Sequence, residues 1–125
     1  MKKMLLLLAA LVIDVSQASA QAPYFQGKTI RFVVGYPAGS THDLWARLVG
    51  PYMTKYISGN PTIITQNMPG AGSATAANYV YNVAKPDGLS IAVVNAALYF
   101  DQVLGRKEVQ FDWSKFAWIG STTPA

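Results

Sequence analysis

The chain has 125 residues, with ten Lys or Arg, six Asp or Glu and no cysteine. Disulfides, thiolate metal sites and cysteine nucleophiles are therefore excluded. The formal net charge is +4, and the basic residues are spread along the chain without the clustered stripe that a phosphate backbone requires. We expect no nucleic acid partner, and the length suits one small domain.

The N-terminus has the pattern of an export signal. Lys2 and Lys3 precede an apolar run at residues 5–13 and a polar stretch that ends at Ala20. The run is too short for a membrane-spanning helix, which needs about 20 apolar residues. We predict that residues 1–20 are a signal peptide cleaved after Ala20, and that the mature protein is periplasmic.

Three apolar runs alternate with helical patterns in the mature part. Residues 29–36, 62–66 and 89–94 are rich in β-branched side chains and show little polar alternation, which predicts strands buried on both faces. The segment after Ser73 has helical spacing, with small residues on the face toward a sheet. The predicted order is therefore β-α-β-α-β.

The first predicted helix follows Ser40 and Thr41, whose hydroxyls can cap it. Pro51 should kink this helix or divide it in two, because it has no N–H for the carbonyl of Arg47. The spacing predicts a strongly amphipathic helix with these apolar residues on one face: Leu44, Trp45, Leu48, Val49, Tyr52, Met53, Tyr56 and Ile57.

Strands that alternate with helices predict an α/β fold with a doubly wound parallel sheet. Ligands of such sheets bind outside the carboxyl ends of the strands. The loops at that edge are residues 37–43, 67–73 and 95–97. Two of them lead directly into helices, whose unpaired N–H groups and positive dipole ends attract anions.

We therefore expect a site for a small anion, formed mainly by main-chain donors. The alternative is that the glycines only permit tight turns and the hydroxyls only cap helices. The candidate substrate-binding residues are Tyr36, Ala38, Gly39, Ser40, Thr41, Asp43, Gly70, Ala71, Gly72, Ser73, Asn95 and Ala96.

Asp43 has two possible roles at the start of the first helix. Its charge can stabilise the helix dipole, by about 0.5 kcal/mol. It can instead face the crevice and accept a hydrogen bond from an ammonium, a hydroxyl or a water on the ligand, and we prefer this second role. Tyr36 ends the first predicted strand, where an aromatic wall beside a ligand is reasonable.

The sequence argues against catalysis. Ser40, His42 and Asp43 are too close in sequence to form a nucleophile, base and orienting group, and no G-x-S-x-G elbow is present. The Gly70-x-Gly72 loop matches a dinucleotide-binding fingerprint poorly, since Thr75 takes the third small position. We expect no enzyme activity, no metal and no cofactor.

Several short segments together resemble one family. These segments are residues 27–31 (GKTIR), 35–39 (GYPAG), 43–47 (DLxAR), 66–73 (QNMPGAGS), 85–88 (KPDG) and 115–121 (KFAWIGS). Through them the chain is similar to the substrate-binding components of tripartite tricarboxylate transporters, the TctC or Bug family.

This resemblance implies a periplasmic-binding-protein-like fold of two lobes that close on a carboxylate. Residues 21–125 would be the N-terminal part of the first lobe, truncated and without the second lobe. The implied partners are a di- or tricarboxylate or related organic acid and the permease subunits of a membrane transporter, and the full-length protein would be a monomer. The alternatives are a fragment of a secreted α/β hydrolase and a truncated remnant that does not bind.

The export signal predicts the mature N-terminus. Mass spectrometry of the product from a periplasmic extract should give a chain that begins at Gln21, because the charged start, the short apolar run and Ala20 define the cleavage site. A product that retains Met1 would contradict export with cleavage and would favour a membrane anchor.

Overall fold

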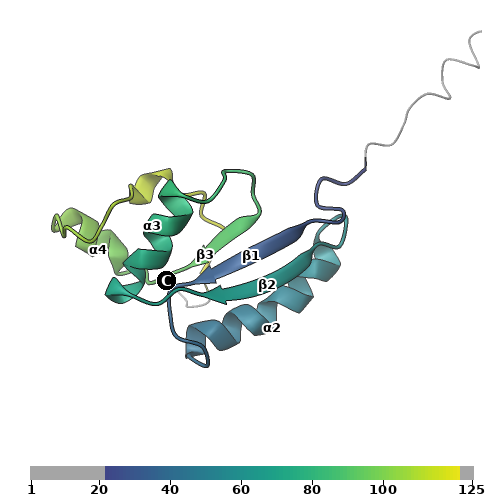
Figure 1. Ribbon diagram of the computed structural model, residues 1–125, viewed down its shortest axis with the longest axis horizontal. Helices are drawn as coiled ribbons and strands as arrows, with labels where there is room; N and C mark the ends of the chain where they lie inside the picture. Colours follow the sequence, from purple (N-terminus) through teal and green to yellow (C-terminus); the bar gives the residue numbers. More distant parts are fainter. Residues whose placement is uncertain (1–21, 122–125) are drawn as a thin grey trace, which may run out of the picture.

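The computed structural model describes residues 22–121, so the predicted signal peptide and its cleavage site lie outside the described residues. Three parallel strands form the sheet: β1 (Thr29–Val34), β2 (Thr62–Asn67) and β3 (Ser90–Val93). Their order is β2-β1-β3, with β1 in the centre (Figure 1). This confirms the predicted α/β class with a parallel sheet, which is compatible with part of a periplasmic-binding-protein-like domain.

Helices flank both faces of this sheet. Helix α2 (Thr41–Tyr56) covers one face, and α3 (Ala74–Asn82), preceded by the short turn η2 (Ala71–Ser73), lies on the other (Figure 1). A short helix, α4 (Leu98–Val103), and a further turn, η3 (Trp113–Lys115), complete the described elements. No helix among residues 22–121 is long and apolar enough to span a membrane.

The residues of β1 alternate between the two faces of the sheet, and those of one face belong to the first of two hydrophobic clusters among residues 22–121. Ile30, Phe32 and Val34 are buried against α2 through Ala46. On the opposite face, Arg31 donates to the hydroxyl of Tyr79 in α3, at 3.4 Å. The second cluster joins α3 and α4 to the C-terminal segment, through Ala74, Ala77, Leu98 and Phe111. A strand covered on both sides explains why β1 reads as a continuous apolar run.

The predicted apolar face of α2 is wrong for most of its large residues, although Met53 and Ile57 pack against the core. Ala46 and Gly50 are buried against the sheet, whereas Tyr52 and Tyr56 are exposed by 58% and 86%. A Cβ added to Gly50 would lie 3.1 Å from Ile63, so only a small residue lets the helix approach β2 this closely. Close approach of the backbone therefore selects the small-residue face. The exposed large side chains of α2 are Leu44, Trp45, Leu48, Tyr52 and Tyr56.

Pro51 does not divide the helix, contrary to one predicted outcome. Helix α2 continues through Pro51 to Tyr56. Pro51 and Arg47 are both exposed, so water can hydrogen-bond the Arg47 carbonyl that receives no N–H from the proline.

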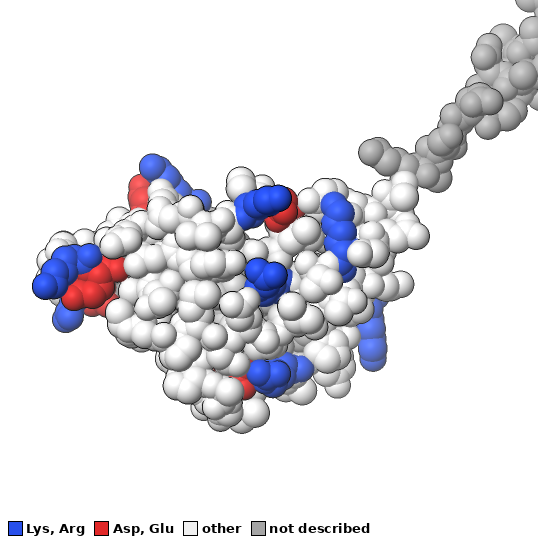
Figure 2. Space-filling model, viewed as in Figure 1, with Lys and Arg blue, Asp and Glu red and all other residues white. Residues whose placement is uncertain are grey.

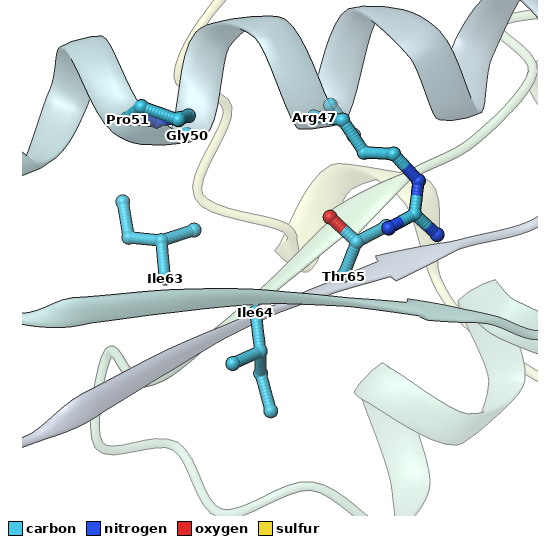
Figure 3. A pocket seen from close by; sticks show the side chains of 7 residues that line it. Arg47, Gly50, Pro51, Ile63, Ile64 and Thr65 are labelled. Atoms are coloured by element: carbon cyan, nitrogen blue, oxygen red, sulfur yellow. The ribbon is translucent and has the colours of Figure 1, made fainter.

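Strand β2 is an edge strand, which corrects the prediction that it is buried on both faces. Ile63 and Thr65 point toward α2, and Ile64 points away from it (Figure 3). Ile64 is 43% exposed, because α3 packs on β1 and β3. The order of the strands, which the sequence pattern does not determine, decides which strand is left half-covered.

Gly35, directly after β1, lies against the start of α3, so adding one methyl group there should strongly affect stability. A Cβ at Gly35 would lie 2.3 Å from the Cβ of Ser73 and 3.3 Å from that of Ala76. Gly35→Ala should lower the free energy of unfolding by about 1–3 kcal/mol, measured by urea denaturation. Gly120→Ala is the control, since a Cβ there meets no atom within 4 Å. Equal stability of the two variants would contradict this packing.

Candidate functional site

The carboxyl ends of the three strands meet at one level of the sheet. Val34, the last residue of β1, pairs with Asn67 at the end of β2 and with Val93 at the end of β3. The three loops that the sequence singled out therefore start side by side. This is the position at which open parallel sheets bind their ligands.

The loop after β2 contains four consecutive residues with positive φ. Gly70 and Gly72 have φ of 144° and 61°, and the non-glycine residues Ala71 and Ser73 have φ of 44° and 78°. Such conformations in non-glycine residues cost on the order of 1–3 kcal/mol each and persist only where the surroundings impose them. Successive N–H groups in a turn conformation can form a concave anion site.

The main-chain donors of this loop are open. The Ser73 N–H donates to the Gly70 carbonyl at 2.9 Å, whereas the N–H groups of Gly70, Ala71 and Gly72 donate to no atom of residues 22–121. All three residues are exposed. We call residues 70–72 the amide turn. It offers a carboxylate up to three donors without any cationic side chain.

The N-terminus of α2 adds donors at the same edge. The hydroxyl of Ser40 accepts from the Asp43 N–H at 3.3 Å, so Ser40 is the cap that the sequence predicted. The N–H groups of Thr41 and His42 belong to the first turn, where no carbonyl four residues earlier lies in the helix. The positive end of the helix dipole favours an anion there.

Ser73 has a different position from the one that we expected. It is only 1% exposed, and its hydroxyl accepts from the Asn95 N–H at 2.8 Å. It makes no capping bond to α3. Ser73 also packs against Gly35, the residue before Tyr36, where an added Cβ would lie 2.3 Å from the Ser73 Cβ. Ser73 thus joins the ends of the three loops, and it is too buried to offer its hydroxyl to a solute.

Tyr36 stands between the first two loops. Its ring stacks on that of His42, with centroids 3.8 Å apart and an angle of 5° between the rings. Burial raises the pKa of the Tyr36 phenol, and its hydrogen bond with Ser73 opposes this effect. Tyr36 is therefore neutral at physiological pH. The stacked pair joins the loop after β1 to the first turn of α2.

Asp43 is buried and has several internal partners. It is 2% exposed and accepts from the Gly39 N–H at 2.8 Å, from Arg47 Nε at 3.0 Å and from Asn67 Nδ2 at 2.8 Å. These bonds, led by the one with Arg47, lower the pKa of Asp43 to about 2. The structure thus favours an internal role for Asp43 over the ligand contact that we preferred.

The hydrogen bonds of Asp43 also determine which main-chain donors of the loop after β1 are open. The Gly39 N–H is taken by Asp43, so Gly39 is not an open donor, whereas Ala38 is exposed beside it. In the third loop, Ala96 is exposed and the Asn95 side chain accepts from the Ala97 N–H at 2.9 Å. Of the candidate residues, the amide turn and the start of α2 have the clearest open donors.

Two residues of this region were missed by sequence reasoning. Asn67 donates through Nδ2 to the Tyr36 carbonyl at 3.1 Å as well as to Asp43. Arg47 Nη2 donates to Asn67 Oδ1 at 3.2 Å. The position of Arg47 four residues after Asp43 on a helix was a usable signal. The Asn67 contact depends on the strand register and had no local signal.

Other features lie away from this edge. A shallow groove of about 470 Å³ runs between α2 and β2 and is lined by residues that include Gly50, Pro51 and Ile63 (Figure 3). Lys and Arg side chains are spread singly over the visible face (Figure 2). Residues 22–121 contain no group of three or more His, Cys, Asp or Glu that could hold a metal ion.

An α/β domain with open main-chain donors at the carboxyl edge of its sheet has them at the position where parallel sheets bind small ligands. No protein-family profile matches the chain. It is 38% identical over 91 residues to the "UPF0065 protein in gbd 5'region" of Cupriavidus necator, a match that covers 73% of this chain and 27% of the relative. It is 34% identical over 110 residues to a UPF0065 protein of Bordetella bronchiseptica, with 88% and 32% covered.

UPF0065 is the curated name of the Bug and TctC family, so these similarities support the resemblance drawn from the motifs. The chain spans about a quarter to a third of the length of the two relatives. What a protein of that length binds or assembles with is therefore a matter for proposal.

The low pKa of Asp43 predicts an acid-dependent loss of stability. The folded-state pKa of about 2 lies below the ordinary value of 3.8. The Asp43 bonds therefore stabilise the fold fully above about pH 4, and this contribution is lost as the pH falls through 2. Urea denaturation should show Asp43→Asn to be less stable than the wild type at pH 6, with the difference shrinking between pH 4 and 2.

Asp112 also has a lowered pKa, owing mainly to its hydrogen bonds with Ser114. The free energy of unfolding of Asp43→Asn will therefore still fall at acid pH, though less steeply than that of the wild type. A stability difference that stays constant from pH 6 to pH 2 would show that the Asp43 charge is not the group that titrates.

Proposed function

We propose that this chain is part of an extracytoplasmic solute-binding receptor of the Bug and TctC family. It captures a small organic carboxylate, a di- or tricarboxylate or a related acid, for a tripartite tricarboxylate-type membrane transporter, and it has no catalytic activity. The observation that carries the proposal is the amide turn. Three successive open N–H groups stand at the edge where parallel sheets bind ligands.

The chemistry of this turn suits a carboxylate. Hydrogen bonds from N–H groups to a charged oxygen contribute about 1.5–3 kcal/mol each. Two of them supply about 3–6 kcal/mol before the loss of translational freedom is subtracted. Even without that subtraction, this range corresponds to dissociation constants from several millimolar to tens of micromolar. The described loops alone should therefore bind an organic acid weakly, and a second lobe that closes over the solute would raise the affinity.

The proposed site holds its solute without a Lys or Arg side chain. Loop residues 37–43 and 68–73 contain no Lys or Arg. Arg47, which is nearby, is paired with Asp43 at 3.0 Å. The bound carboxylate is therefore held by the geometry of the main chain, and recognition depends on the conformation of residues 70–73 more than on their side chains.

A hydrolase is disfavoured by the partners of the polar side chains. Ser40 Oγ accepts from the Asp43 N–H, and His42 stacks on Tyr36. Asp43 is bonded to Gly39, Arg47 and Asn67. A nucleophile, a base and an orienting carboxylate would have to bond in series. Here the three side chains serve a helix cap, an aromatic stack and an internal ion pair.

The amide turn predicts a local effect of side-chain bulk. Gly72→Val should reduce the affinity for organic acids at least tenfold, equivalent to about 1.4 kcal/mol. A Cβ at Gly72 points into open space in front of the turn, where the solute would lie, and valine also strains its positive φ. Isothermal titration with citrate, succinate and benzoate would measure the change.

Gly88→Val is the matched control. Gly88 has φ of +75° and no atom within 4 Å of an added Cβ, so it shares the conformation and the space of Gly72. It precedes β3, at the opposite end of the strands. Equal affinity of Gly72→Val and the wild type would place the anion site elsewhere.

A further inference from the structure

Asp43, Arg47 and Asn67 form a closed triangle of hydrogen bonds. Asp43 Oδ2 accepts from Arg47 Nε at 3.0 Å, and Asp43 Oδ1 accepts from Asn67 Nδ2 at 2.8 Å. Arg47 Nη2 closes the triangle by donating to Asn67 Oδ1 at 3.2 Å. Two members lie on successive turns of α2, and the third is the last residue of β2.

Two further bonds extend the triangle into the loop after β1. Asn67 Nδ2 donates to the Tyr36 carbonyl at 3.1 Å, and the Gly39 N–H donates to Asp43 Oδ2 at 2.8 Å. These bonds hold both ends of residues 36–39. Packing does not hold the middle, because Pro37 and Ala38 are exposed. A Cβ at Gly39 would meet no atom within 4 Å.

We infer that the triangle is a latch that fixes the loop after β1 against the end of β2, and that Asp43 is a positioning residue that does not touch the solute. The inference rests on the proposed function, since it concerns the same loops. Asn67 lies three residues before Gly70, where the amide turn begins. The latch therefore sets the spacing of the two donor loops before any solute arrives.

The latch also narrows the class of solute. Asp43 Oδ2 accepts two hydrogen bonds and Oδ1 accepts one, and the residue is 2% exposed. An ammonium group on the solute would have to displace Gly39, Arg47 or Asn67 to reach it. Asp43 therefore does not distinguish carboxylates that carry an ammonium group from those that do not. Aspartate and succinate differ by that group alone, which makes them a matched pair of probes.

Amide hydrogen exchange tests the latch without any ligand. In the complete chain, Asn67→Ala and Asp43→Asn should each speed exchange of the Gly39 N–H at least tenfold more than that of the Arg31 N–H, which donates to the Leu89 carbonyl within the sheet at 2.8 Å. Asp101→Asn is the control, since it breaks the exposed Asp101–Arg106 pair. Equal factors at Gly39 and Arg31 would mean that the triangle only supports global stability and would overturn the inference.

Titration with succinate and with aspartate tests the role of Asp43. Asn67→Ala should weaken both acids about tenfold, because the loop spacing is lost. Asp43→Asn should change the affinities for succinate and aspartate by the same factor. That factor includes any gain in affinity from the positive charge of Arg47, which loses its partner in the variant. A loss for aspartate that exceeds the loss for succinate tenfold would show that Asp43 contacts the solute, and would overturn the inference. If the wild type binds neither acid, the proposed function is contradicted for these probes, and the exchange data alone decide on the latch.

Discussion

The parallel pairing of β1 with both of its neighbours is the constraint on which the site depends. Because Val34 is opposite both Asn67 and Val93, three chain segments leave the sheet at the same level. The buried, two-sided apolar character of β1 puts it in the centre. A shift of the β1–β2 pairing by one residue would turn the side chains of β2 to the other face and would carry Asn67 away from Asp43.

Local sequence signals predicted the three strands, the two helices between them and their order, but not α4 or η3, and they predicted the edge at which the open donors lie. They failed where the answer depended on contacts between elements. The large apolar residues of α2 point to solvent because Gly50 must pass close to Ile63. Asp43 appeared free to meet a ligand because its partner Asn67 is 24 residues away and comes near only through the strand register.

The two donor regions are stabilised in different ways. The loop after β1 is held by polar side chains, through the triangle of Asp43, Arg47 and Asn67. The turn after β2 is held by its own left-handed backbone, which is wedged against β1 at Gly35. A polar latch weakens at low pH, whereas a wedged backbone does not depend on pH. Acid should therefore loosen the first loop before it disturbs the second.

Ser73 is where stability and binding make opposite demands. Its φ of 78° favours glycine, so Ser73→Gly would relieve backbone strain. That change would remove the hydroxyl that accepts from the Asn95 N–H, and the loops after β2 and β3 would lose the bond that joins them. Larger residues are excluded, because the side chain already faces the bare backbone of Gly35. Serine is thus a compromise, and efforts to make the chain more thermostable should leave this position unchanged.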